Sequence, residues 1–154
     1  MTCGCTSIIA MQNGVMHHTR NLDYPITPSK MWECLYEARF MKNNEYLFSG
    51  FGFAGFQGVY TTFKPGKFSI SYNVWSIDMK WGFLKNMILA FQDVQKWSMI
   101  LWKANIECET YEECLQFLES TKSVGPCYLT VCGITQGAKL ARTWACADLE
   151  TFVT

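Results

Sequence analysis

The fold is decided by one stretch near the start of the chain: CTSIIAMQ at residues 5–12, NG at 13–14 and VMHHTRNL at 15–22. Two apolar runs flank Asn-Gly, the pair that most readily adopts the positive φ angles of a type I′ turn. The stretch therefore predicts a β-hairpin in which Ser7 lies opposite Arg20. In this register Arg20 shares a face with Cys5 and is diagonal to it across the two strands. A cation beside a cysteine favours the reactive thiolate, so Cys5 is a candidate nucleophile.

The same stretch carries a resemblance to a known family. Its halves, CTSI at residues 5–8 and RNLDYP at 20–25, resemble the start of the choloylglycine-hydrolase and acid-ceramidase superfamily of N-terminal-nucleophile (Ntn) amidases. The similarity continues more loosely through residues 51–73 and the helical middle of the chain. It implies part of the αββα sandwich of Ntn hydrolases. It also implies cleavage before Cys5, with residues 1–4 a propeptide remnant and residues 5–154 a catalytic domain that is incomplete at its C-terminus.

The resemblance implies a role for each matching residue. Cys5 corresponds to the nucleophile, Arg20 to the cation beside the thiol, and Asp23 to the carboxylate that orients the α-amine released by cleavage. That amine titrates near about 7.7–8.0 and can act as a general base, which a peptide nitrogen cannot do. Gly4 fits the cleavage site because a residue without Cβ tolerates strained backbone. Cleavage is therefore expected to activate the enzyme.

Two of the candidate positions depend on strand geometry. Strict alternation along the second strand sends Asp23 to the face opposite Cys5, so its role requires a bend or bulge before Tyr24-Pro25. Residues 68–73, FSISYN, predict a strand similar to the superfamily strand that ends in an asparagine beside the nucleophile. Asn73 is therefore a candidate oxyanion-hole donor, through its backbone N–H. The alternative is an asparagine that simply ends a strand.

A metal site is the alternative for the hairpin, because thiolates and imidazoles are common zinc ligands. In the predicted register His18 faces Ile9, about 13 Å along the strand from Cys5, which disfavours this reading. No cofactor or metal is expected. The four residues that the metal alternative would use are Cys3, Cys5, His17 and His18.

The expected substrate is a fatty-acid amide of the N-acylethanolamine or ceramide type. Cleavage of an acyl amide follows from the implied mechanism, whereas the lipid follows from the resemblance and from the 16% of aromatic residues. A catalytically inactive lipid-binding relative or fragment remains an alternative, as does a bile-salt or penicillin-type amide hydrolase. The resemblance also implies an α subunit from a propeptide and a lysosomal or secretory location. Peripheral contact with a membrane is a further expectation.

The composition and charge limit the other functions that the protein could have. Thirteen basic and thirteen acidic residues give a net charge of zero, and no basic cluster could follow a phosphate backbone, so nucleic-acid binding is not expected. The eight cysteines show no disulfide framework in their spacing, and no apolar leader precedes Cys5.

The chain ends at TFVT, before the point where the superfamily's Asn-Tyr-Asp segment would supply an oxyanion donor. We therefore expect weak activity from this chain alone.

The rest of the pattern predicts strands, then helices, then strands, which is typical of an α+β fold. A 3.6-residue period begins at Lys80, Asp93 could cap the second helix, and Thr110 begins a capping box. The predicted strands cover 32–40, 46–63 (one or two), 68–73, 126–134 and 139–144, with turns at 43–44, 64–67 and 136–137. The apolar helical stripes are at 81, 84, 88 and 91 and at 94, 97, 101 and 104, and a further helix begins at 111.

Overall fold

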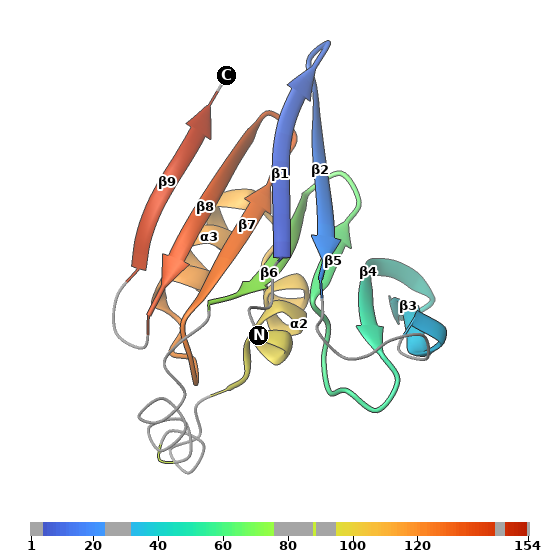
Figure 1. Cartoon of the computed structure of the whole chain (residues 1–154). Helices are drawn as coiled ribbons and strands as arrows, with labels where there is room; N and C mark the ends of the chain where they lie inside the picture. The colour runs from blue at the N-terminus through green and yellow to red at the C-terminus, as the bar shows by residue number, and fades with distance from the viewer. Residues whose placement is uncertain (1–4, 24–31, 76–87, 89–94, 144–146, 154) are drawn as a thin grey trace.

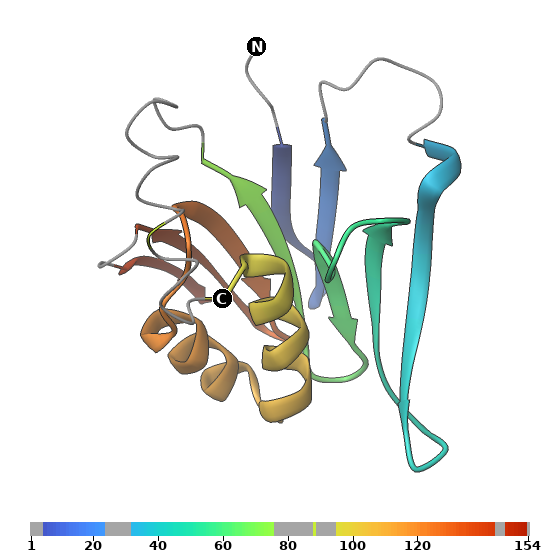
Figure 2. The same cartoon turned by 90° about the horizontal axis from the view of Figure 1, so that it is seen from below.

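The computed structural model describes residues 5–23, 32–75, 88, 95–143 and 147–153. Within these residues a seven-stranded antiparallel sheet carries two helices on one face and a β-hairpin on the other (Figures 1 and 2). The hairpin is β1 (Cys5–Gln12) and β2 (Val15–Leu22). The sheet runs in chain order through β3 (Leu35–Lys42), β4 (Glu45–Phe53), β5 (Thr61–Lys64), β6 (Phe68–Val74), β7 (Cys127–Cys132), β8 (Gln136–Arg142) and β9 (Ala147–Val153).

The hairpin has the predicted register. Ser7 pairs with Arg20 and Cys5 with Leu22, without a shift along its length. Asn13 and Gly14 both have positive φ angles, 53° and 76°, as a type I′ turn requires. Residues of β1 and β2 alternate between half-buried and exposed near the Cys5 end, so one face of the hairpin packs on the sheet.

Strand β6 shows why the sheet can have two different layers on its two faces. Its sequence FSISYNV alternates between apolar and small polar residues, and successive side chains of a strand point to opposite faces. Phe68 and Ile70 are buried in the core beneath the helices. Ser69, Ser71 and Asn73 face the hairpin, where they hydrogen-bond with its side chains.

The helical layer consists of α2 (Trp97–Glu107) and α3 (Tyr111–Ser120). The predicted capping box begins α3: the Thr110 hydroxyl accepts from the Glu113 N–H, and the Glu113 carboxylate accepts from the Thr110 N–H. Lys64, at the end of β5, is buried and donates to the Cys108 carbonyl (2.7 Å) just beyond α2. The fully buried apolar residues of this layer and the sheet below it are Ile70, Ile100, Leu101, Ala104, Cys114, Leu118, Cys127, Leu129, Val131, Ala138 and Leu140.

The predicted turn at Gln136-Gly137 is wrong. The chain turns earlier, where the Gly133 N–H donates to the Gln136 carbonyl (2.8 Å), and Gln136 already belongs to β8. Gly137 serves close packing: a Cβ at this position would lie 2.8 Å from Cδ1 of Ile9 in the hairpin. A glycine in a strand marks either a turn or a close approach, and the sequence alone does not distinguish them.

Other boundaries also differ from the prediction. Residues Trp32–Cys34 form a 3₁₀ turn, η1, instead of the start of a strand, and the run over 46–63 divides into β4 and β5. Strand β9 was not predicted. The helix expected from the stripe at 81–91, apart from residue 88, and the cap at Asp93 lie outside the described residues. In the part of the chain that is described, neither helix is long and apolar enough to span a membrane.

Candidate active site

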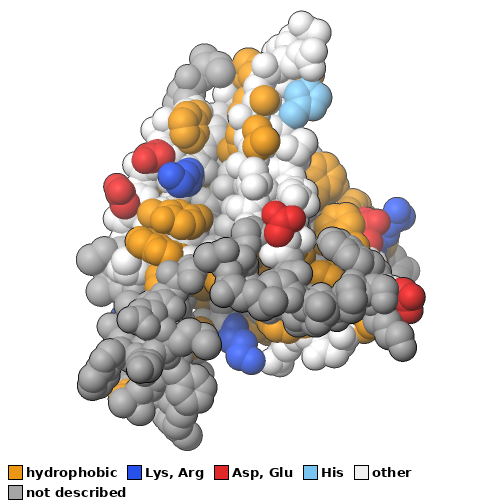
Figure 3. Space-filling view, viewed as in Figure 1, with side chains coloured by type: hydrophobic (Ala, Val, Ile, Leu, Met, Phe, Trp, Pro, Cys, Tyr) orange, Lys and Arg blue, Asp and Glu red, His pale blue; other side chains and the backbone are white. Residues whose placement is uncertain are grey.

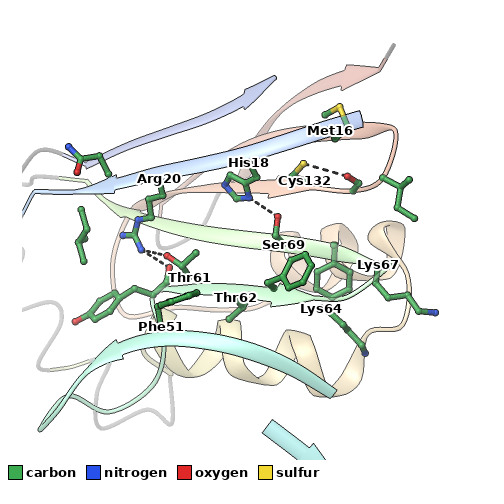
Figure 4. A pocket seen from close by; sticks show the side chains of 18 of the residues that line it. Met16, His18, Arg20, Phe51, Thr61, Thr62, Lys64, Lys67, Ser69 and Cys132 are labelled. Carbon is green, nitrogen blue, oxygen red and sulfur yellow. Dashed lines mark hydrogen bonds between the residues drawn. The ribbon is translucent and has the colours of Figure 1, made fainter. Parts of the chain in front are cut away.

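Arg20 links the hairpin to the sheet. Its guanidinium reaches from β2 to the ends of β5 and β6, where it donates to the Thr61 hydroxyl (2.5 Å; Figure 4), to the Tyr60 carbonyl (2.9 Å) and to the Tyr72 carbonyl. Burial lowers the pKa of Arg20, and an attractive interaction with Cys5, within hydrogen-bonding reach, acts in the opposite direction. The structure therefore places Cys5 beside the Arg20 cation, as the register predicts.

Asn73 lies on the same side of the sheet. Its side-chain amide lies against the Ser7 hydroxyl, with Nδ2 3.0 Å and Oδ1 3.2 Å from Ser7 Oγ, and Ser7 is two residues from Cys5 on the inner face of β1. The Tyr72 N–H donates to the Tyr60 carbonyl on the β5 side. Because N–H groups alternate in direction along a strand, the Asn73 N–H points toward β7, opposite Tyr128. The side-chain amide is therefore the group of Asn73 that faces the hairpin.

Asp23 lies just beyond the end of β2. Its carboxylate accepts a hydrogen bond from Asn21 Nδ2 (2.8 Å), and both side chains are exposed. The regular register up to Leu22 carries Asn21 to the outer face of the hairpin. The bend predicted before Tyr24-Pro25 lies outside the described residues.

Sequence reasoning missed a row of polar residues beneath the hairpin. The His18 ring lies between two serines of β6, with Nδ1 2.7 Å from Ser69 Oγ and Nε2 3.0 Å from Ser71 Oγ. Ser71 Oγ is in turn 2.7 Å from Ser7 Oγ. Burial, with a smaller contribution from Arg20, lowers the pKa of His18 to about 4, so the ring is neutral at neutral pH. Alternating serines on a strand were the available signal, but the hairpin facing them could not be foreseen.

The metal alternative gains no support from the geometry. The described residues contain no group of three or more His, Cys, Asp or Glu side chains that could hold a metal ion. His18 hydrogen-bonds to serines, His17 is exposed on the opposite face of β2, and Cys3 lies outside the described residues.

A groove of about 740 Å³ lies between β2 and strands β4, β5 and β6 (Figure 4). It extends from Arg20 and Leu22 toward the hairpin turn at Val15, and Cys5 is not among its lining residues. Its volume is in the range of about 300–1,000 Å³ that is usual for small-molecule sites. The apolar side chains along it are Val15, Met16, Leu22, Leu35, Phe51, Phe53, Phe63, Phe68 and Ile134. Such a lining suits an apolar ligand.

The surface on the hairpin side is also largely apolar. Viewed from this side, apolar side chains follow the hairpin and cover parts of β8 and β9, with few charged groups between them (Figure 3). Ile8 on β1 and Phe152 on β9 are each more than half exposed, at 55% and 53%.

Comparison with known proteins identifies the family. No protein-family model matches the chain. Acid ceramidase from Bos taurus is 34% identical over 148 residues, which cover 86% of this chain and 37% of that protein. N-acylethanolamine-hydrolyzing acid amidase from Caenorhabditis elegans is 29% identical over 152 residues, or 95% of this chain and 42% of that protein. A solved structure of a C. elegans N-acylethanolamine-hydrolyzing acid amidase ortholog superposes with a TM-score of 0.85 at 27% identity, covering 95% of this chain and 63% of that one.

The chain belongs to the acid ceramidase superfamily. The resemblance carried by residues 5–8 and 20–25 is thereby confirmed, and so is the α+β fold, with antiparallel sheets and helices as in the solved relative. The chain spans about two fifths of the length of these curated relatives. The roles of Cys5, Arg20, Asp23 and Asn73 within this superfamily fold stay predictions.

Proposed function

We propose that the protein hydrolyses the amide bond of a fatty-acid amide, of the N-acylethanolamine or ceramide type, with Cys5 as the nucleophile. The observation that supports this most is the position of Cys5 beside Arg20 at the open end of the hairpin. The relatives named above are amide hydrolases by name, which supports the bond that is cleaved. The apolar groove that begins at Arg20 favours a lipid amide over a polar one.

Activation is proposed to be cleavage before Cys5. The Cys5 thiolate attacks the Gly4 carbonyl, the peptide C–N bond breaks, and the amine takes up a proton. Water then hydrolyses the resulting thioester, which leaves a Gly4 carboxylate and a free α-amine and thiol on Cys5. Cys5 pairs with Leu22, so Asp23 follows at the end of the hairpin where this new amine would form. We assign Asp23 the role of orienting it.

Turnover follows the same chemistry with the lipid amide as substrate. The α-amine takes the thiol proton, the thiolate attacks the carbonyl carbon, and a tetrahedral oxyanion forms. The Asn73 side-chain amide is our candidate donor to this oxyanion, because it faces the hairpin near Cys5. One such donor is typically worth about 2.7–4 kcal/mol. The α-amine then passes the proton to the leaving amine, and water releases the fatty acid.

The test combines N-terminal sequencing with a panel of lipid amides. An active sample should begin Cys-Thr-Ser-Ile and release fatty acid from an N-acylethanolamine or a ceramide. Cys5→Ala should lose at least about 10³-fold in turnover, whereas Cys34→Ala, which removes an exposed free thiol, should retain it.

Each other outcome has a distinct meaning. An active sample that still begins at Met1 would reject activation by cleavage. Binding of the amides without turnover would identify an inactive lipid-binding relative, and turnover of bile-salt or penicillin-type amides alone would reject the lipid substrate. A lysosomal location and a separate α subunit remain part of the proposal, to be tested in cells and by copurification.

A further inference from the structure

We propose that His18 is a positioning residue for this reaction. As its Nε2–H tautomer it allows the hydroxyls of Ser71 and Ser7 to donate toward Oδ1 of Asn73, so that no Asn73 N–H has to be committed to Ser7 and the amide can donate to the oxyanion. The inference rests on the proposed function. It adds a role for four side chains that the proposed mechanism does not otherwise use.

The contacts form a connected chain of side chains. Ser69 Oγ lies 2.7 Å from His18 Nδ1, His18 Nε2 lies 3.0 Å from Ser71 Oγ, and Ser71 Oγ lies 2.7 Å from Ser7 Oγ (Figure 4 shows the first contact). Ser7 Oγ then reaches Asn73, at 3.2 Å from Oδ1 and 3.0 Å from Nδ2. The chain connects both hairpin strands to β6.

The tautomer of His18 limits the directions in which the protons of this chain can point. A neutral imidazole has one donor and one acceptor nitrogen, and each serine hydroxyl has one proton to donate. If Nε2 carries the proton and donates to Ser71, the Ser71 hydroxyl is free to donate to Ser7, and Ser7 is free to donate to Asn73 Oδ1. If Nδ1 carries the proton, the order reverses and Asn73 Nδ2 donates to Ser7. The tautomer of His18 is therefore coupled to the role of the Asn73 amide.

Only the first order suits catalysis. It anchors the amide by its oxygen and does not require an Asn73 N–H to donate to Ser7, whereas the second order does. Preorganised donors stabilise an oxyanion because they need no reorientation during the reaction. The lowered pKa of His18 keeps its ring neutral at neutral pH. The Ser69 hydroxyl can then donate its proton to the unprotonated Nδ1.

The first experiment separates reactions of Cys5 that need an oxyanion donor from those that do not. Acylation by a p-nitrophenyl ester of a fatty acid passes through an oxyanion, whereas alkylation by iodoacetamide does not. In the processed protein, which begins at Cys5, His18→Leu should lower the acylation rate at least about tenfold and change alkylation less than twofold. His18→Gln, which keeps a donor and an acceptor, should restore part of the loss. His17→Leu, on the exposed face of β2, is the matched control.

Two results would overturn the inference. Equal losses in acylation and alkylation would mean that His18 only holds the hairpin on the sheet, and unchanged acylation in His18→Leu would mean that it has no role. Absence of acylation in the protein without substitutions would instead reject the proposed function, and the positioning role of His18 with it.

The second experiment does not depend on activity. ¹⁵N chemical shifts of the His18 ring should show a protonated Nε2 and an unprotonated Nδ1 at neutral pH. The side-chain NH₂ resonances of Asn73 should shift in His18→Leu and stay in place in His17→Leu. A ring protonated at Nδ1, or Asn73 resonances that ignore His18, would disprove the hydrogen-bond order even in an active enzyme.

Discussion

The two faces of the seven-stranded sheet differ in how they hold the layer above them. On the helix side, Ile70, Leu129 and Leu140 are fully buried against α2 and α3. On the hairpin side, hydrogen bonds run between polar groups of β6 and the side chains of Arg20 and His18 of β2. The same strands supply both faces, since the alternation of a strand separates them. One face supplies stability, and the other supplies directional contacts near Cys5, the proposed nucleophile.

The energies of the two kinds of contact differ accordingly. Full burial of a leucine is worth about 1.5–3 kcal/mol, whereas a hydrogen bond contributes about 0.5–1.5 kcal/mol net. The hairpin layer should therefore open locally at a lower free energy than the helical layer.

The first prediction concerns the apolar face. Leu129→Ala removes a fully buried side chain beneath the helices and should lower the free energy of unfolding by about 2–5 kcal/mol in urea titrations. Leu149→Ala on edge strand β9, where the side chain is 36% exposed, is the matched control and should cost less than about 1 kcal/mol. Similar losses in the two variants would show that the helix side is not the main source of stability.

The second prediction uses pH to address the polar face. The folded pKa of His18 is about 4 against 6.5 for the free side chain, so the unfolded chain binds more protons between these values. The resulting stabilisation of the folded state is fully present above about pH 6.5. It is lost as the pH falls toward 4, by at most about 1.4 kcal/mol of unfolding free energy per pH unit. Urea titrations at several pH values should show a flatter dependence in His18→Gln. His17→Gln should keep the original dependence, and a slope unchanged by the His18 substitution would remove this ring as its source.

The helix side and the hairpin were the most predictable parts of the sequence. Asn13-Gly14 set the hairpin register, and Thr110 with Glu113 set the start of α3, because these signals are local. His18 was not predicted as a site residue, since its partners Ser69 and Ser71 lie far along the chain and meet it only when the hairpin packs on the sheet. The same long-range packing explains the error at Gly137.

The last prediction is the smallest and tests whether the two faces are independent. Thr110→Ala removes the hydroxyl that accepts from the Glu113 N–H (3.2 Å) and so opens the capping box of α3. The cost should be about 0.5–2 kcal/mol of unfolding free energy, and Thr110→Ser, which keeps the hydroxyl, should recover most of it. The rates of acylation and alkylation of Cys5 should not change, because α3 packs on the face of the sheet away from the hairpin (Figure 2). If Thr110→Ala lowered acylation as strongly as His18→Leu, the helical layer would have to transmit its packing through the sheet, and the separation of the two faces would fail.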